Sequence, residues 1–203
     1  MSQASFSALS LQEFIDAIGA KVPTPGGGAV ASAVGAIAAA LGRMVVSYSL
    51  GKKNLADHQP LLADADARLI RAARVLMMLA DEDAAAYGAV NELSKLPESD
   101  PRRTELAAAQ AASAQVPLSV AAAAVDLLRL FRDLAGTTNR YLRSDLGIAA
   151  VLARATVDAS RWNVMINLPS LPADQAAAVG KAIDELCALA KTLCADVEAR
   201  CAA

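Results

Sequence analysis

The chain has 203 residues, of which 55% are hydrophobic, 20% charged and only 3% aromatic, so it can bury one sizeable core and is not disordered. Because 49 residues are alanine, which favours helices over strands, we expect an all-α, single-domain bundle of long antiparallel helices spanning residues 1–203. The formal charge is −2, with 19 basic and 21 acidic residues, which excludes the basic surface of an electrostatic nucleic-acid binder.

The start of the chain lacks the features of a targeting segment. No basic residue precedes Lys21, which argues against a secretory signal and an Arg-rich transit peptide. Residues 22–42 and 106–125 are uncharged, but prolines, glycines or glutamines interrupt both, so we interpret them as buried helices and expect no membrane partner.

The first helix is predicted by Ser10 and Glu13, which have the spacing of a capping box. Two prolines and three glycines between residues 23 and 28 then break the pattern. Further predicted helix ends are marked by Gly51 and Pro97, and the Asp100–Pro101 pair marks the start of a helix. The remaining helices are predicted at 29–50, 59–96, 101–136, 144–167 and 173–203.

The last predicted helix carries two repeating patterns. Its apolar residues alternate in steps of four and three, which is typical of a packing seam: Val179, Ile183, Leu186, Ala190, Leu193 and Val197. With the alanine-rich second helix, this seam offers more apolar surface than one bundle covers, so we expect a homodimer. The cysteines at 187, 194 and 201 are about 10.5 Å apart along the helix axis, too far to bridge one another or share a metal. We interpret them as small packing positions in a reducing, cytoplasmic environment.

The sharpest local signal is the segment from Pro23 to Gly28, which leads into a helix. Glycines expose backbone N–H groups, and a helix N-terminus adds partial positive charge, so Thr24 and Gly26, Gly27 and Gly28 are candidates to bind an anion or a polar ring edge. The spacing fits neither a dinucleotide fingerprint nor a phosphate loop. The alternative is a turn that needs positive φ and allows close helix packing.

An acidic triplet, Asp81 to Asp83, lies within the third predicted helix. Two helical residues rotate by about 200°, so Asp81 and Asp83 face different directions. Asp83 shares its face with Leu79 and Tyr87, which predicts an inward carboxylate with the raised pKa that suits a general base. The alternative is an exposed acidic turn.

Polar residues near predicted helix ends have both structural and functional interpretations. Asn139, Ser144 and Asp145 precede or begin the fifth helix, where Ser144 or Asp145 is also a candidate N-cap. Asn163 and Asn167 lie four residues apart on one helix face. Either they bind a ligand or they mark the end of a helix. Lys52 follows the second helix, where its dipole favours a cation. His58 is the single histidine and has no second histidine with which to anchor zinc, so no metal site is expected.

Five segments, taken together and in order, resemble a known family. They are the block from PTPGGG to GKK at 23–53, DEDAAAY at 81–87, AQVPL at 114–118, SDL at 144–146 and NVMINL at 163–168. The chain thus resembles the cyclodeaminase/cyclohydrolase family, which includes the C-terminal half of formiminotransferase-cyclodeaminase and stand-alone methenyltetrahydrofolate cyclohydrolases. The resemblance implies an all-helical homodimer that binds a tetrahydrofolate derivative in a cleft to which both subunits contribute.

The implied reaction is hydrolysis of 5,10-methenyltetrahydrofolate to 10-formyltetrahydrofolate, without a metal or redox cofactor. Asp83 is the first choice for the catalytic base and Asp145 the second, with Lys52 supporting ionisation or proton transfer. The expected substrate-binding residues are Thr24, Gly26, Gly27, Gly28, Asn139, Ser144, Asn163 and Asn167. One alternative is a formimidoyltetrahydrofolate cyclodeaminase, which releases ammonia, and another is a non-catalytic helical scaffold.

Overall fold

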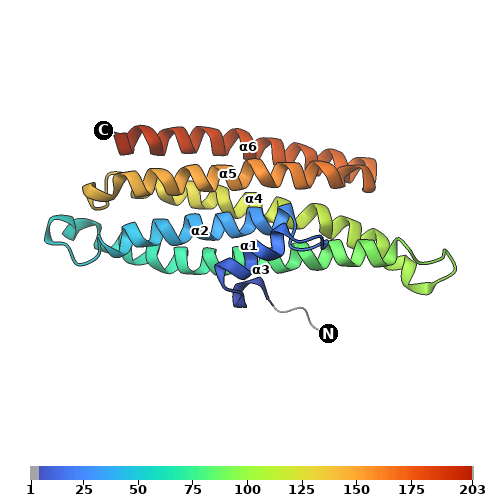
Figure 1. Cartoon of the computed structure of the whole chain (residues 1–203). Helices are drawn as coiled ribbons and strands as arrows, with labels where there is room; N and C mark the ends of the chain where they lie inside the picture. The colour runs from blue at the N-terminus through green and yellow to red at the C-terminus, as the bar shows by residue number, and fades with distance from the viewer. Residues whose placement is uncertain (1–4, 203) are drawn as a thin grey trace.

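The computed structural model describes residues 5–202, which form an elongated bundle of α-helices without a β-strand in that range (Figure 1). The predicted all-α fold is therefore confirmed. The α-helices are α1 (Leu11–Gly19), α2 (Gly27–Ser47), α3 (Gln59–Leu93), α4 (Leu106–Leu134), α5 (Arg143–Asn167) and α6 (Ala173–Ala202). Short 3₁₀ helices join or precede them: η1 (Phe6–Ala8), η2 (Lys53–His58), η3 (Pro101–Glu105), η4 (Arg140–Leu142) and η5 (Leu168–Ser170).

The five long helices pack side by side along the bundle. Helix α2 contacts α3 and α5, α4 contacts α3 and α5, and α6 packs on α5 and α4. In Figure 1, α5 lies between α2 and α6 with α4 behind them, and the short α1 lies across α2 and α3. The helices differ in length, from 21 residues in α2 to 35 in α3, so α2 stops short of the end at which α3 and α4 are joined, but residues at the two termini of each long helix are far apart.

Helices α2 and α3 each carry a stripe of packing positions spaced seven residues apart. On α3, the stripe is formed by Leu62, Leu69 and Leu76, which are fully buried. On α2, Gly35 and Gly42 lie where a Cβ atom would crowd Leu76 or overlap the Phe131 ring, respectively. Small residues on α2 thus let neighbouring helices approach closely, as expected.

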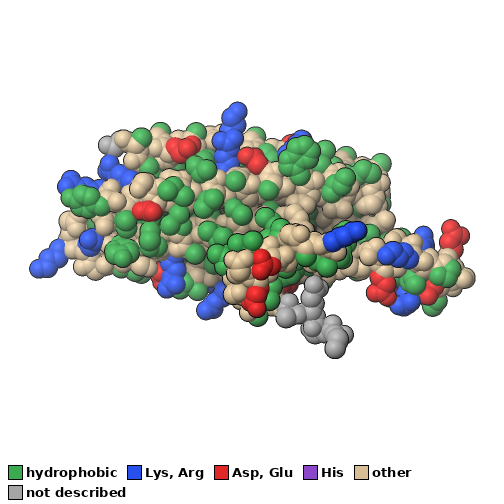
Figure 2. All heavy atoms as spheres, viewed as in Figure 1, with side chains coloured by type: hydrophobic (Ala, Val, Ile, Leu, Met, Phe, Trp, Pro, Cys, Tyr) green, Lys and Arg blue, Asp and Glu red, His purple; other side chains and the backbone are tan. Residues whose placement is uncertain are grey.

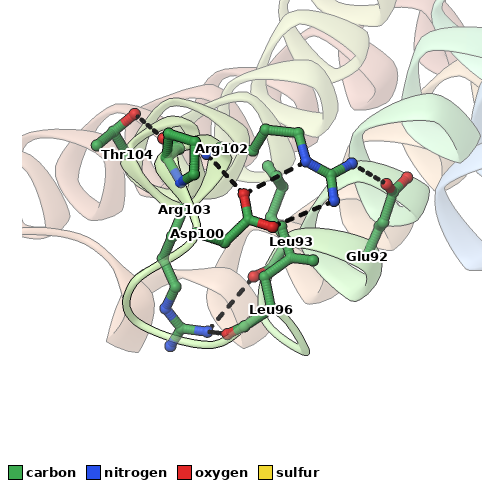
Figure 3. Close-up of polar contacts among 8 residues, drawn as sticks. Glu92, Leu93, Leu96, Asp100, Arg102, Arg103 and Thr104 are labelled. Atoms are coloured by element: carbon green, nitrogen blue, oxygen red, sulfur yellow. Dashed lines mark hydrogen bonds and ion pairs between the residues drawn. The ribbon is translucent and has the colours of Figure 1, made fainter.

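Helix starts agree with the predicted signals in two places. Ser10 and Glu13 form the predicted capping box of α1. The Asp100 side chain accepts a hydrogen bond of 2.9 Å from the Arg102 backbone N–H at the start of η3. Figure 3 shows this connection, in which the Arg103 guanidinium also donates to the carbonyl of Leu96 at 2.6 Å. These contacts fix the turn between α3 and α4, which projects from one end of the bundle (Figure 1).

The apolar seam of α6 packs within its own chain. Ile183, Ala190 and Val197 are fully buried, and Leu193 nearly so. The expectation that this seam adds exposed surface for a second subunit is therefore wrong, because α4 and α5 already cover it.

The three cysteines of α6 are free thiols, of which Cys194 is buried and the other two half-buried. All three belong to the hydrophobic core or pack against it, as predicted for small packing positions. Burial raises the pKa of the Cys194 thiol to about 11.

Two helical segments, Gly27–Ser47 and Pro101–Leu134, are long and apolar enough to cross a membrane by length and composition alone. In the bundle, 61% and 50% of their most apolar 18-residue windows are buried, respectively. Buried core helices meet the same criteria, so this finding is weak support for a membrane span.

Candidate functional site

A cavity of about 320 Å³ opens where the start of α2 meets α3, α4 and α5. It is lined by Pro23, Thr24, Gly26, Gly27, Gly28, Asp83, Tyr87, Ser113, Asn163, Ile166 and Asn167. The fold thus brings together, from three segments far apart along the chain, most of the candidate residues that the sequence predicted.

The glycine turn, Gly26–Gly28, forms one wall of this cavity. Gly26 is the N-cap of α2 in an extended conformation, with φ −111° and ψ −163°. Within residues 5–202, positive φ occurs only at Gly51 and Gly136, so the alternative that this turn needs positive φ is wrong. Close approach explains the glycines instead: a Cβ at Gly28 would overlap the Asp83 carboxyl group, and one at Gly27 would lie 3.3 Å from Asn163 Oδ1.

Asp83 lies on α3 with its carboxylate against the glycine turn. It accepts a hydrogen bond from the backbone N–H of Ala29, in the first turn of α2. Gly26, the N-cap of that helix, has no side chain to provide a cap, so Asp83 supplies from another helix the acceptor that an N-cap usually provides.

Burial determines the proton affinity of Asp83. Removal from water raises the pKa of this carboxyl group, and the hydrogen bond from Ala29 opposes the rise without cancelling it. Asp83 is therefore a stronger base than an exposed carboxylate, and it faces inward as expected.

The charges around the cavity are unbalanced. Among the lining residues, the titratable ones are Asp83 and Tyr87, and none is a lysine or arginine. An ionised Asp83 thus faces the cavity without a cationic side chain in its lining, an arrangement suited to a ligand that carries positive charge.

Two carboxamides from α5 form the opposite wall. Asn167 Nδ2 donates to the backbone carbonyls of Ser113 at 2.9 Å and Asn163 at 2.8 Å. Asn163 Nδ2 donates to the carbonyl of Ala159 at 3.3 Å. Asn167 is also the last residue of α5, so the interpretation as a helix end is confirmed, while ligand binding by this pair stays a prediction. Both N–H groups of Asn167 and one of Asn163 thus donate to backbone carbonyls, and the Oδ1 atoms are the groups that can accept from a ligand.

Asp81 faces away from the cavity, as the helical rotation predicts. Its carboxylate accepts hydrogen bonds from Ser5 Oγ at 2.5 Å and from the Phe6 backbone N–H at 2.8 Å. Asp81 therefore holds the N-terminal segment and is not placed to act on a ligand in this cavity.

The remaining predicted residues lie at the opposite end of the bundle. Lys52 follows α2, whose 21 residues span about 31 Å. Asn139 lies near the same end, since its backbone N–H donates to Ser49 Oγ at 2.8 Å. Within one chain, Lys52 and Asp145 therefore lie apart from Asp83, separated by about the length of α2 or of α5 (Figure 1), so a site that contains all three needs a second subunit, as the expected shared cleft implies.

At this end, local structure accounts for part of the polar pattern. The Asn139 side chain accepts from the Tyr141 backbone N–H and caps η4. Helix α5 begins at Arg143 after Leu142, so neither Ser144 nor Asp145 is its N-cap. Asp145 lies in the first turn of α5, where the helix dipole favours an anion.

Sequence reasoning missed four lining residues: Pro23, Tyr87, Ser113 and Ile166. Tyr87 could have been included, since it lies one helical turn after Asp83 on the same face. Ile166 could have been included on the same ground, since it lies three residues after Asn163 on one helix, whereas Ser113 carries no such signal, because only the packing of α4 brings it to the cavity. In the described part of the chain, no group of three or more His, Cys, Asp or Glu side chains is arranged to hold a metal ion.

Comparison with known proteins agrees with this geometry. A family model described as formiminotransferase-cyclodeaminase matches residues 10–185. The formimidoyltransferase-cyclodeaminase of Mus musculus is 35% identical over 174 residues, which are 81% of this chain and 31% of that protein. The chain thus spans about a third of the length of the animal relatives it matches.

Two relatives match over most of both chains. The methenyltetrahydrofolate cyclohydrolase of Methylorubrum extorquens is 28% identical over 167 residues, 80% of each chain. The crystal structure of formiminotetrahydrofolate cyclodeaminase from Thermotoga maritima superposes with a TM-score of 0.89 and 32% identity, covering 96% of each chain. The fold, the order of the segments around the cavity and these matches together show that the chain belongs to the cyclodeaminase/cyclohydrolase family.

Proposed function

We propose that this chain is a methenyltetrahydrofolate cyclohydrolase, a hydrolase that opens a cyclic amidine in one-carbon metabolism. The observation that carries the proposal is the half-buried Asp83 carboxylate, which faces a cavity whose lining lacks a cationic side chain. 5,10-Methenyltetrahydrofolate carries a delocalised positive charge at its bridging carbon, and this charge would pair with Asp83. The cyclohydrolase of Methylorubrum extorquens, similar over 80% of its length, supports this reaction.

In the proposed reaction, Asp83 removes a proton from water as the water oxygen attacks the bridging carbon. The carbon becomes tetrahedral, and the positive charge of the amidine is lost in that step. The intermediate then collapses: the new hydroxyl group loses its proton to solvent and becomes the formyl C=O, the bond between the carbon and N5 breaks, and N5 takes up the proton held by Asp83. The formyl group stays on N10, and one proton is released overall. The raised pKa of Asp83 suits this role, because a general base works best when its pKa approaches the working pH.

The other cavity residues are proposed to hold the folate. Backbone N–H groups of the glycine turn, the Thr24 hydroxyl and the oxygens of Asn163 and Asn167 match the donors and acceptors of the pterin edge or the glutamyl tail. At the rim, Tyr87 and Ile166 are 50% and 77% exposed and offer apolar surface to a flat ring.

A second candidate reaction is formimidoyltetrahydrofolate cyclodeamination. The solved cyclodeaminase from Thermotoga maritima, which matches over 96% of each chain, favours it. In that reaction N10 attacks the formimino carbon and ammonia leaves, so the site must deliver a proton to the leaving nitrogen. A carboxyl group with a raised pKa retains a proton at higher pH than usual and suits that role as well.

Two assays on one preparation test these reactions. We expect the purified protein to accelerate the loss of methenyltetrahydrofolate, followed by its absorbance, and to release no ammonia from the formimino substrate. Ammonia release would instead assign the chain as a cyclodeaminase. If neither assay exceeds the rate measured without protein, the chain is a non-catalytic helical scaffold.

We further propose that the chain acts as a homodimer. Helix α2 carries an outward apolar stripe, the α2 stripe, with steps of four and three residues: Val30, Val34, Ile37, Leu41, Met44 and Tyr48. Ile37 and Tyr48 are 52% and 62% exposed. Figure 2 shows hydrophobic side chains gathered over α2 and α5 on this face, with most basic ones toward its margins. A groove of about 510 Å³ between α1 and α2 continues the same apolar surface.

The α2 stripe is centred near residue 39, and this position has a consequence for the site. If two copies pair antiparallel through a two-fold axis at this centre, position 26 of one chain lies opposite position 52 of the other. The partner's Lys52 would then approach the glycine turn, and the residues at the far end of the bundle, Asn139, Ser144 and Asp145, would complete the cavity. In that position the partner's Lys52 would assist proton transfer from the rim, while Asp83 still pairs with the substrate cation in a lining that holds no lysine or arginine of its own chain.

Replacing Ile37 with glutamate is expected to convert the dimer to a monomer and to reduce activity, because it places a charge at the centre of the α2 stripe. Sedimentation velocity at micromolar concentration measures the change. Val75→Glu is the matched control, since Val75 is 46% exposed on α3, outside the stripe. A wild-type chain that sediments as a monomer would contradict the shared cavity.

Mixing two inactive variants tests whether residues from both chains form one site. If Lys52 of one chain serves Asp83 of the other, an unfolded and refolded equimolar mixture of Asp83→Asn and Lys52→Ala contains one intact cavity per mixed dimer. Activity should recover to about a quarter of the wild-type value. No recovery would mean that Lys52 acts within its own chain or not at all.

Other properties are proposed on chemical grounds. Hydrolysis of an amidinium ion needs neither a metal nor a redox cofactor. Three free cysteines fit a reducing, cytoplasmic location. The balance of charges, −2 overall, and the mixed surface argue against a nucleic-acid or membrane partner.

A further inference from the structure

The N-terminal brace, residues 5–19, comprises η1 and α1 and lies across α2 and α3 (Figure 1). Its polar anchor is Asp81 on α3, which accepts hydrogen bonds from Ser5 Oγ at 2.5 Å and from the Phe6 N–H at 2.8 Å. A carboxylate that accepts two such bonds holds its partners more firmly than a neutral acceptor does.

The apolar part of the brace packs on the back of the candidate site. Phe6 and Phe14 are buried, and their ring centroids are 5.7 Å apart. They form a second hydrophobic cluster, separate from the main core, with four alanines of α2 and α3: Ala29, Ala33, Ala80 and Ala84. Ala84 is the neighbour of Asp83 in the chain, and Ala29 donates its backbone N–H to the Asp83 carboxylate. The brace thus packs on the residues that flank this hydrogen bond.

The first turn of α2 depends on such outside contacts. Its N-cap is Gly26, which has no side chain to hold the helix start, and two further glycines follow. Glycine is the most flexible residue of the backbone, so the position of this turn is set by Asp83 on one side and by the aromatic pair on the other.

We propose that Asp81 is a positioning residue: by anchoring Ser5 and Phe6, it holds the N-terminal brace against the first turn of α2 and so fixes the glycine turn relative to Asp83. The effect on the turn is independent of the reaction catalysed, whereas the effect on turnover rests on the proposed function. Asp81 touches no part of the cavity and acts through the brace.

The direct test is amide hydrogen exchange on the full chain. In Asp81→Ala, we expect the amides of Ala29 and Val30 to exchange about tenfold faster than in the wild type, because the loss of both anchor bonds loosens the brace. Amides of α6 around Ile183 and Ala190 should keep their rates. Glu82→Ala is the matched control, since Glu82 is the exposed neighbour of Asp81 and its loss removes the same charge from the same helical turn.

Variants that remove one or both anchor bonds separate an effect on the glycine turn from a general loss of folding. Asp81→Asn retains an oxygen for the Phe6 N–H and can donate to Ser5 Oγ, so it should restore near wild-type exchange. Ser5→Ala removes one anchor bond and should have a smaller effect than Asp81→Ala. If Asp81→Ala merely lowers the melting temperature, with exchange at Ala29 and Val30 rising no more than elsewhere, Asp81 has a general structural role and the proposal is wrong.

Kinetics provide the second measurement. Well below the melting temperature, Asp81→Ala should lower kcat about tenfold with little change in KM, because the base is displaced from the reacting atoms while the binding groups of α5 stay in place. An unchanged kcat despite faster exchange would contradict the positioning role. If the wild type has no folate activity, the proposed reaction fails but the exchange result still decides whether Asp81 positions the turn.

Discussion

Replacing Asp83 with asparagine is expected to lower kcat/KM by about 10²- to 10⁴-fold, because an amide cannot take a proton from water. The asparagine Oδ1 can still accept the Ala29 N–H, so the start of α2 should stay in place. Hydrolysis of methenyltetrahydrofolate measures the loss, and circular dichroism checks the helix content. Full activity in this variant would transfer the role of base to another residue, with Asp145 next in line.

The same variant should be at least as stable as the wild type near neutral pH. Burial raises the pKa of Asp83 above its ordinary 3.8, so the folded state binds this proton more tightly than the unfolded state does. The resulting stabilisation is fully present below the ordinary pKa and is lost as the pH rises through the raised one. At neutral pH the ionised carboxylate therefore lowers the free energy of unfolding, and the uncharged asparagine lacks this effect.

Thermal unfolding at two pH values measures this linkage. Near neutral pH, Asp83→Asn should melt at the wild-type temperature or above it, and the gap should close as the pH falls to about 4. Asp83→Ala is the comparison, because it also removes the acceptor for Ala29 and should melt lower than Asp83→Asn. If the asparagine variant is destabilised but fully active, the role of Asp83 is only to cap the start of α2.

Gly28→Ala is expected to be the most damaging small change at the glycine turn. The added Cβ would overlap the Asp83 carboxyl group, so either the carboxylate or the start of α2 must move, at a cost of about 1–3 kcal/mol. Activity should fall sharply because the base is displaced. Gly88→Ala is the matched control: Gly88 lies on α3 with open space around it, and alanine there should stabilise the helix by about 0.5–1 kcal/mol.

Gly27→Val separates ligand binding from folding at the same turn. A Cβ here meets Asn163 Oδ1 at 3.3 Å, so we expect KM to rise while helix content stays near the wild-type value. The substitution should be milder for stability than Gly28→Ala, because the neighbouring carboxamide can shift. A lower melting temperature with unchanged folate affinity would make the glycine turn purely structural.

The sequence predicted the helices well because their signals are local. Capping residues, prolines and glycines mark the helix ends, and the predicted α2 and α3 differ from the structure by three residues or fewer at each end. The inward direction of Asp83 was also predictable, since Leu79 and Tyr87 define its face. These inferences need only the geometry of one helix.

The division of the site residues between the two ends of the helices was partly predictable. A helix from 29 to 50 already separates the glycine turn from Lys52 by about 33 Å, which fits the expected cleft formed by two subunits rather than one. Which face of α6 the other helices cover depends on tertiary packing, and so does the presence of Ser113 in the cavity. No local pattern contains that information.

The leucine stripe of α3 carries a consequence for how such a site can arise. Asp83 lies seven residues after Leu76, as Leu76 follows Leu69, and Gly28 lies seven residues before Gly35. The carboxylate thus occupies the next packing position of the repeat, opposite the next small residue of α2. The candidate base therefore needs no inserted loop to hold it, because the packing repeat that positions the leucines also positions this carboxylate. Extending the leucine repeat, as in Asp83→Leu, should yield a more stable bundle that lacks the proposed activity.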